Sequence, residues 1–232
     1  MTRACRSVVA VCAVASLLVA GVGVSPASAK TINGCVIKAK TECKNAQLEG
    51  AKLNKANLKG AKLQNAQLSK AKLKGANLKG ANLKDADLTR ANLTKANLTK
   101  ANLSANLTRA NLTRANLTKA RLSEAGLEGA NLTKANLSGA NLSGADLTKA
   151  NLTGANLTGA DLTKANLTNT NLTNANLTNA NLSGAALINT DLSGANLSGV
   201  NLSGADLDLA NLTGVSLTGV NLTGVIWSKP NS

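Results

Sequence analysis

Leucine recurs at every fifth residue over most of this chain. It does so from Leu48 to Leu103 and, after one shortened step, from Leu107 to Leu222, which makes 36 units. Ala stands two positions before the Leu in 31 of them, and the other positions are mostly Asn, Asp, Lys, Gly, Ser and Thr. A period of five matches neither the 3.6 of an α-helix nor the 2 of a flat strand. The chain must therefore turn at regular intervals, with Leu and Ala inside and polar residues in the turns.

The pattern A-[N/D/K]-L-x-x starts at Ala46 with the units AQLEG, AKLNK and ANLKG. It resembles the pentapeptide-repeat family across essentially the whole chain beyond residue 45. The resemblance implies an all-β fold, a right-handed quadrilateral parallel β-helix in which each unit forms one side and four units close one coil. Leu and the small residue two positions before it would point inward. About nine coils at about 4.8 Å each would give a solenoid roughly 43 Å long.

Two details favour a 20-residue coil, and one interrupts it. Thr170 and Thr190 are 20 residues apart, as are Val200 and Val220, so each pair would stack in an inward column. Leu103 and Leu107 are only four apart, because the unit there has four residues. We expect a tightened corner near Ser104, with regular stacking resumed beyond it.

Residues 1–29 have the pattern of a secretory signal peptide. Arg3 and Arg6 form a positively charged N-terminal region, residues 8–24 are apolar apart from Ser16 and small residues, and Ala27-Ser28-Ala29 is typical of a cleavage site. We therefore predict a secreted protein, extracellular or held in the cell wall, with no transmembrane segment after signal removal. The predicted organisation is a signal peptide (1–29), an N-terminal cap (30–45), the repeat (46–229) and a short tail (230–232).

Both ends of a solenoid need covering, because an open coil exposes Leu and unpaired backbone groups. Cys35 and Cys43 remain as an even pair in an exported chain, which favours a disulfide within the N-terminal cap. At the other end Trp227 falls in a Leu position and is a candidate lid over the last coil. No C-terminal helix of the kind that helps some family members to dimerise is recognisable, so we expect a monomer.

The charge is large and unevenly distributed. The full chain carries +15, and loss of the signal peptide leaves 24 basic and 11 acidic residues, a net +13. Residues 30–121 hold 20 basic and four acidic side chains, whereas residues 122–232 hold four basic and seven acidic ones. A strongly basic half indicates a partner surface, and we expect it to dock onto anionic cell-wall or other extracellular polymers of a bacterium.

Stacking would bring basic residues 20 apart to within about 5 Å of one another. Like charges at that spacing repel, and they become favourable only opposite an anion. A solvated surface that keeps the protein soluble is the alternative. Without aromatic side chains to stack on bases, sequence-specific nucleic-acid recognition is not expected. The candidate polyanion-binding residues are Lys52, Lys59, Lys70, Lys72, Lys79, Arg90, Arg114 and Lys134.

Nothing in the sequence predicts catalysis, a cofactor or a metal. His is absent, which removes the commonest general base and metal ligand. Two carboxylate pairs, Asp85 with Asp87 and Glu124 with Glu128, lie among basic residues, and we interpret them as solubilising surface groups. The recurring Asn-Leu-Thr and Asn-Leu-Ser triplets match the glycosylation sequon, but the repeat itself generates them.

Two further functions are compatible with such a fold. Some members of the family that the chain resembles inhibit topoisomerases by mimicking duplex DNA with an acidic surface, and the resemblance makes this an alternative function. The positive charge and the predicted signal peptide argue against that role. Regular Thr spacing on a flat solenoid face also resembles some ice-binding proteins. The rows here, which include Thr94, Thr99, Thr108 and Thr113, are mixed with Ser and Lys. We therefore favour a secreted, non-enzymatic structural or interaction protein.

Overall fold

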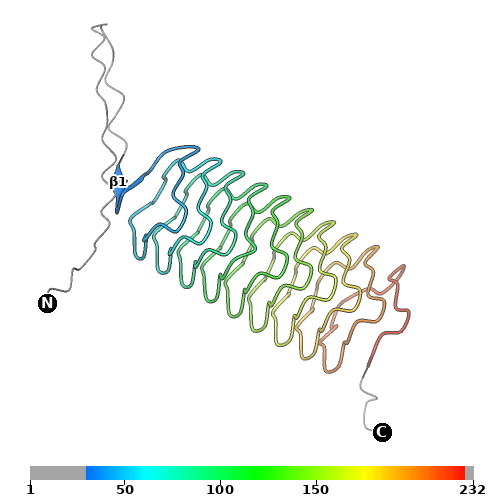
Figure 1. Cartoon of the computed structure of the whole chain (residues 1–232). Coiled ribbons are helices and arrows are strands. Elements are labelled where there is room, and N and C mark those ends of the chain that lie inside the picture. Colours follow the sequence, from blue (N-terminus) through cyan, green and yellow to red (C-terminus); the bar gives the residue numbers. More distant parts are fainter. Residues whose placement is uncertain (1–29, 228–232) are drawn as a thin grey trace, which may run out of the picture.

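The computed structural model describes residues 30–227, which form a straight stack of four-sided coils (Figure 1). The predicted signal peptide (1–29) lies outside the described residues, as do residues 228–232 with the end of the predicted repeat and the tail. Among residues 30–227 no helix is long and apolar enough to cross a membrane.

A short hairpin opens the described chain. Strand β1 (Thr31–Ile32) pairs antiparallel with strand β2 (Cys35–Val36). The two residues between them, Asn33 and Gly34, have φ angles of 47° and 79°, and an Asn-Gly pair adopts this left-handed backbone most readily in two-residue hairpins. A disulfide joins Cys35 to Cys43, with 5.4 Å between their Cα atoms. The bond ties the hairpin to the first coil.

Beyond the hairpin, each side of a coil pairs in parallel with the corresponding side of the next coil. The second residue of each unit makes the bridge, as Lys52 does with Lys72 and Asn57 with Asn77. Leu53 N donates to the Lys72 carbonyl at 2.8 Å, and Lys72 N donates to the Ala51 carbonyl at 2.9 Å. Four units therefore close one coil, and the polar backbone groups of each coil are satisfied by the next.

This register sorts the units into four faces. Face 1 carries Leu48, Leu68 and Leu88; face 2 carries Leu53, Leu73 and Leu93; face 3 carries Leu58, Leu78 and Leu98; face 4 carries Leu63, Leu83 and Leu103. The second and fourth residues of each unit lie on the outside of its face. The fifth residue lies at the edge with the following face, so that edge 2/3, for example, consists of the fifth residues of face-2 units.

The interior is made almost wholly of Leu and Ala, as the pattern predicts. Both positions are fully buried through most of the stack, and a buried Leu stabilises by about 2 kcal/mol before conformational entropy is counted. Thr170 and Thr190 occupy Ala positions with only 1% of their surface exposed. Their hydroxyls donate to the carbonyls of Leu147 and Leu167 at 2.7 and 2.6 Å, so neither polar group is left unsatisfied.

The edges explain why Asn, Gly and Lys recur in the repeat. The fifth residue has a left-handed backbone, with φ near 60° at Lys55, Gly60 and Asn65 alike. The Asn or Asp at the second position caps the turn, as when Asn92 Oδ1 accepts the Thr94 N–H at 3.1 Å and the Thr94 hydroxyl at 2.7 Å. The Asn-Leu-Thr triplets therefore have a structural role in the turns.

The shortened unit is absorbed within a single coil. Across it the bridges join residues 19 apart, as Asp87 does with Asn106, and the spacing returns to 20 at Asn106 with Gly126. The backbone at Ser104 and Ala105 lacks the left-handed turn residue found at the edge of neighbouring units. Faces 1 to 4 therefore continue in the same order beyond the slip, starting at Leu107.

The C-terminal end is less closed than the lid expected from the sequence. Trp227 continues the register of face 1, since Leu207 N donates to the Ile226 carbonyl at 2.9 Å. However, Trp227 is 45% exposed, and Leu212, Leu217 and Leu222 of the other three faces are only partly buried. Within the described residues Trp227 covers one column of the core, because a single ring cannot reach across four faces.

Reduction of the Cys35–Cys43 disulfide is expected to loosen the N-terminal end alone. Disulfides typically contribute about 2–4 kcal/mol, and the lower value suits this short loop. Because each coil contacts only its neighbours, the loss should stay local. Hydrogen exchange with and without reductant should show faster exchange at Ile37 and Cys43, and unchanged protection around Leu142. Loss of protection along the whole stack would contradict a local role for the disulfide.

Candidate polyanion-binding surface

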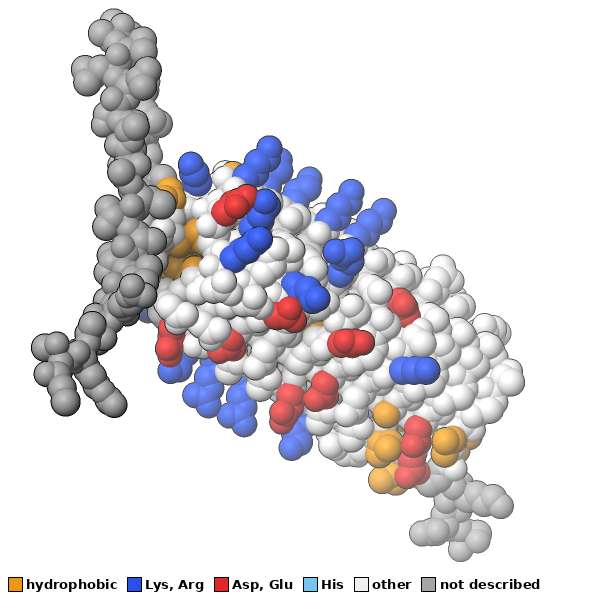
Figure 2. Space-filling model, viewed as in Figure 1, with side chains coloured by type: hydrophobic (Ala, Val, Ile, Leu, Met, Phe, Trp, Pro, Cys, Tyr) orange, Lys and Arg blue, Asp and Glu red, His pale blue; other side chains and the backbone are white. Residues whose placement is uncertain are grey.

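Basic side chains gather on two neighbouring faces of the N-terminal half. Figure 2 shows Lys and Arg concentrated toward the hairpin end and sparse toward the far end. The register places these residues on faces 2 and 3 and on the edges that bound face 3, and all of them are exposed. This basic surface consists of Lys52, Lys72 and Lys74 on face 2, Lys59 and Lys79 on face 3, Lys55, Lys95, Arg114 and Lys134 on edge 2/3, and Lys40, Lys100 and Lys119 on edge 3/4.

Acidic residues lie elsewhere. Face 3 and its two edges carry no carboxylate within residues 30–227, and the one on face 2 is Asp191, several coils beyond the last lysine of that face. Glu42 and Asp161 lie on face 4. The remaining eight lie on face 1 or on edge 4/1, and they are Glu49, Asp85, Asp87, Glu124, Glu128, Asp146, Asp206 and Asp208. The solenoid therefore has a basic side and, diagonally opposite, an acidic side.

Ion pairing follows the same division. In the described chain the salt bridges are Lys62 with Glu42 at 2.5 Å, Lys70 with Glu49 at 3.1 Å, and Lys84 with Asp85 at 4.0 Å. The hydrogen bond from Lys62 holds the pKa of the Glu42 carboxyl below its usual range. None of these lysines belongs to the basic surface.

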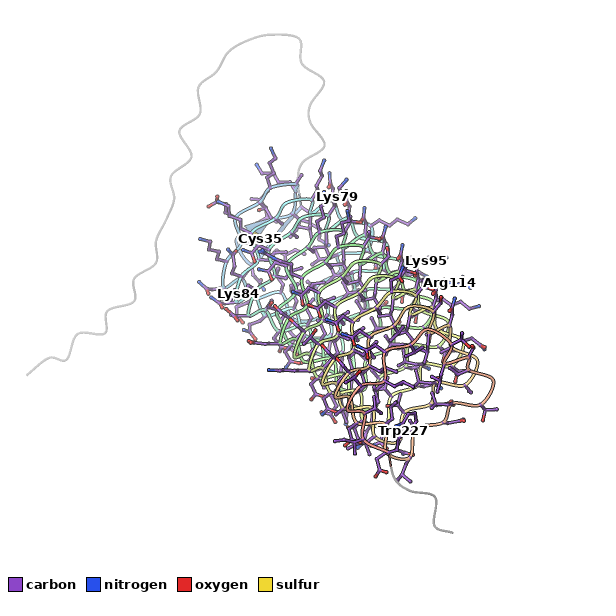
Figure 3. The ribbon with its side chains drawn as sticks, turned by 90° about the vertical axis from the view of Figure 1, so that its right-hand side faces the viewer. Cys35, Lys79, Lys84, Lys95, Arg114 and Trp227 are labelled. Atoms are coloured by element: carbon purple, nitrogen blue, oxygen red, sulfur yellow. A yellow bond between two sulfur atoms is a disulfide. The ribbon has the colours of Figure 1, made fainter. Side chains whose placement is uncertain are left out.

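The structure brings together six of the eight candidate residues from the sequence. Lys52, Lys72, Lys59 and Lys79 lie on adjoining faces, and Arg114 and Lys134 share the edge between them. Figure 3 shows Lys79 with Lys95 and Arg114 along one side, and Lys84 on the opposite side. Lys70 and Arg90 lie apart from this set, on edge 1/2, next to the carboxylates of face 1.

Six members of the basic surface were not among the candidates. The face or edge of each of these residues can be found from the sequence alone. Residues 20 apart stack on one another, and residues 19 apart do so across the slip. Ranking the lysines by face instead of by nearest stacked pair would have found them. They are Lys40, Lys55, Lys74, Lys95, Lys100 and Lys119.

The carboxylates do not form a catalytic constellation. Asp85, Asp87 and Glu124 line a shallow hollow of about 600 Å³ at the slip, and Glu128 lies outside it. Asp87 Oδ1 is already used by the Thr89 N–H at 2.9 Å. Residues 30–227 contain no cluster of three or more potential ligands that could hold a metal ion. The acidic pairs thus remain surface groups around a wide, open depression.

One further carboxyl has a structural role. Asp191 Oδ1 accepts the Ser193 N–H at 2.9 Å, and Oδ2 accepts the Thr173 hydroxyl at 3.2 Å. These bonds, that from the Ser193 backbone first, lower the pKa of Asp191. Asp191 therefore substitutes for the Asn that caps the same turn in other coils.

Comparison with known families decides the classification. The family model described as pentapeptide repeats matches in eight copies, over residues 41–80, 66–104, 105–144, 127–163, 155–194 and 190–226. This chain belongs to the pentapeptide-repeat family. Its right-handed quadrilateral β-helix is the fold of that family, whose members are generally structural or interaction proteins. The comparison with curated proteins gives no match.

Solved structures of other pentapeptide-repeat proteins are similar to this one. HetL, from the cyanobacterium Nostoc sp. strain PCC 7120 and involved in heterocyst differentiation regulation, is 38% identical, with 82% of this chain and 89% of HetL covered and a TM-score of 0.52. Rfr23 from the cyanobacterium Cyanothece 51142 is 43% identical over 40% of this chain and 64% of its own, with a TM-score of 0.39. QnrB1, a plasmid-mediated fluoroquinolone resistance protein, is 22% identical over 75% and 91%, with a TM-score of 0.38.

Proposed function

We propose that this pentapeptide-repeat protein is a secreted, non-enzymatic scaffold that docks onto anionic polymers of the bacterial cell surface through its basic surface. The observation that carries the proposal is the segregation of charge on faces 2 and 3. A dozen lysine and arginine side chains lie there on successive coils, with no carboxylate among them in that half of the stack.

Like-charge crowding supports a binding role over mere solubility. Solubility is served by interspersed charges of both signs, which lower the local field. Here neighbouring basic residues repeat at the spacing of the coils, about 4.8 Å, and their repulsion is relieved when an anionic chain lies along them. The predicted signal peptide and the disulfide are compatible with a location outside the cytoplasm, and the anionic polymers of the cell wall lie there.

Mimicry of duplex DNA fits the charge poorly. A DNA mimic presents negative charge to a DNA-binding protein, whereas the described coils carry their excess of charge as Lys and Arg. The acidic residues of face 1 are flanked by Lys70, Arg90 and Arg109 on edge 1/2. An ice-binding role would require a long uncharged Asn and Thr face to be the active one, and would leave the basic surface without a function.

Binding to cell walls across a salt series tests the proposal. We expect the protein to sediment with walls that retain teichoic acid and to stay in solution with walls stripped of it. Affinity should fall steeply with salt, because each contacted phosphate releases a counterion, with a slope of about 0.7 per contact for a single-chain polyanion. Heparin and duplex DNA are the comparison polymers. Absence of wall binding at low salt would contradict a wall-specific role. Equal affinity for teichoic-acid-bearing walls, heparin and duplex DNA would contradict it as well.

A further inference from the structure

A hollow of about 560 Å³ lies within the basic surface, where face 3 meets face 4. Four lysines surround it: Lys40, Lys59, Lys79 and Lys100. Gly60 and Gly80 form its floor, and Ala39 and Asn57 complete the lining. Its volume is in the range of sites that hold small molecules, about 300–1,000 Å³. The hollow is therefore large enough to admit a small ligand.

The two glycines create this space. On edge 3/4 the column of fifth residues runs Lys40, Gly60, Gly80, Lys100, so two coils without side chains separate two lysines. A Cβ atom added at Gly80 would meet nothing within 4 Å, whereas one added at Gly60 would contact Lys40 Cγ at 3.6 Å, so the open space lies mainly over Gly80. The backbone does not demand glycine there, because Lys and Asn adopt the same left-handed conformation at many other edges. The effect of Gly60 and Gly80 is thus an open notch along a column that could have been filled.

The lining indicates what the notch accepts. Its walls are the methylene stems of lysines and the carbon atoms of glycine, which suit the C–H face of a sugar ring. Four lysines line it, and no carboxylate does. None of the four lysines is in a salt bridge within residues 30–227. A phosphate ester at the rim would supply the missing counter-charge and accept hydrogen bonds from several lysines.

We infer that the notch formed by Lys40, Gly60, Lys59, Lys79, Gly80 and Lys100 binds a phosphorylated sugar unit, with the ring on the glycine floor and the phosphate between the ammonium groups. This inference rests on the proposed function, and it deepens it. The wider basic surface holds an anionic polymer by charge, whereas the notch recognises one sugar phosphate of that polymer by shape.

Filling the notch without changing any charge is the direct test. Gly80→Asn places a side chain in the hollow, and Asn already occupies the equivalent conformation at Asn65 and Asn169. The matched control is Gly159→Asn. Gly159 lies in the same column on edge 3/4, has φ near that of Gly80, and an added Cβ there also meets nothing within 4 Å. Its neighbours on that edge, one coil before and one coil after, are Gly139 and Asn179, so no lysine lies next to it.

Glucose 6-phosphate, glucose and inorganic phosphate are the probes, titrated by NMR into the wild-type protein and both variants. We expect glucose 6-phosphate to shift the amide signals of Gly60 and Gly80 and to bind at least tenfold more tightly than inorganic phosphate or glucose. Gly80→Asn should weaken this binding at least tenfold, and Gly159→Asn should leave it unchanged. Equal affinity for inorganic phosphate, or unaltered glucose 6-phosphate binding by Gly80→Asn, would overturn the inference.

The wall-binding assay separates the two proposals. If Gly80→Asn loses glucose 6-phosphate but still sediments with walls, the notch and the wider surface are distinct parts of one binding function. If the wild-type protein binds glucose 6-phosphate yet fails to bind walls, the docking proposal fails while the sugar-phosphate site stands. If it binds walls but not glucose 6-phosphate, only the notch inference fails.

Discussion

Leu152→Asp is expected to lose at least about 4 kcal/mol of unfolding free energy. Leu152 lies on face 2 with none of its surface exposed, and Leu152 N donates to the Asn171 carbonyl at 2.7 Å inside the stack. Truncating a buried Leu costs about 2–5 kcal/mol, and an unpaired carboxyl at the same place adds a desolvation penalty. Thermal unfolding followed by circular dichroism should show a midpoint lower by at least roughly 10 °C.

Asn151→Asp is the matched control for this substitution. It introduces the same side chain one residue earlier, on the outside of the same face, where Asn151 is exposed. Asn151 Oδ1 accepts the Thr153 N–H at 2.9 Å, and a carboxylate oxygen can accept the same bond, as Asp146 and Asp161 do in other units. The melting midpoint should stay within about 1 °C of wild type. Similar losses in the two variants would argue against the inward position of the Leu.

Removing four charges from the basic surface is expected to weaken polymer binding about a thousandfold. The variant combines Lys72→Gln, Lys79→Gln, Lys95→Asn and Arg114→Asn, with Asn used at the left-handed edge positions. Each basic residue close to an anionic surface contributes about 1 kcal/mol, so four of them account for about 4 kcal/mol. The slope of log affinity against log salt should fall by about 3. Sedimentation with teichoic-acid-bearing walls across a salt series measures both quantities.

A variant with an equal loss of charge on the other side distinguishes a surface from net charge. Lys44→Gln, Lys84→Gln, Arg121→Gln and Lys164→Asn lie on face 4 and edge 4/1, away from edge 2/3. Lys84 is also only 4.0 Å from Asp85, so part of its charge is already compensated. We expect this variant to lose less than tenfold in affinity. Equal losses in the two variants would mean that binding depends on total charge and not on faces 2 and 3.

Much of the fold could be predicted from the sequence, because a single residue pattern repeats through it. The inward Leu, the 20-residue coil and the pairing of Thr170 with Thr190 follow from spacing, since each inward column fixes which residues can stack. The disulfide of Cys35 with Cys43 likewise follows from their being the only cysteines beyond residue 29. Local turn chemistry and global stacking point to the same structure.

The candidate site could be predicted only in part. Pairs such as Lys52 with Lys72 follow directly from the 20-residue period. The exclusion of carboxylates from face 3 needed every outward residue to be assigned to a face through the slip. The hollow at Gly60 and Gly80 depends on the absence of side chains from edge 3/4 in two successive coils, and a search for charged residues does not detect a missing side chain. The prediction that Trp227 covers the last coil holds for one face only, because the end of a four-sided coil is wider than one indole ring.

The uneven placement of charge along the stack has a consequence for how the molecule would approach an anionic surface. With +16 in residues 30–121 and −3 in residues 122–232, the charge distribution has a dipole component along the stack, in addition to the component across it between the basic and acidic sides. In the field of an anionic surface a dipole experiences a torque, and the field extends about one Debye length, about 8 Å at physiological salt. The molecule would rotate before contact, so that faces 2 and 3 of the N-terminal half, near the Cys35–Cys43 disulfide, turn toward the anionic surface. Orientation during approach is thus built into the order of the repeats.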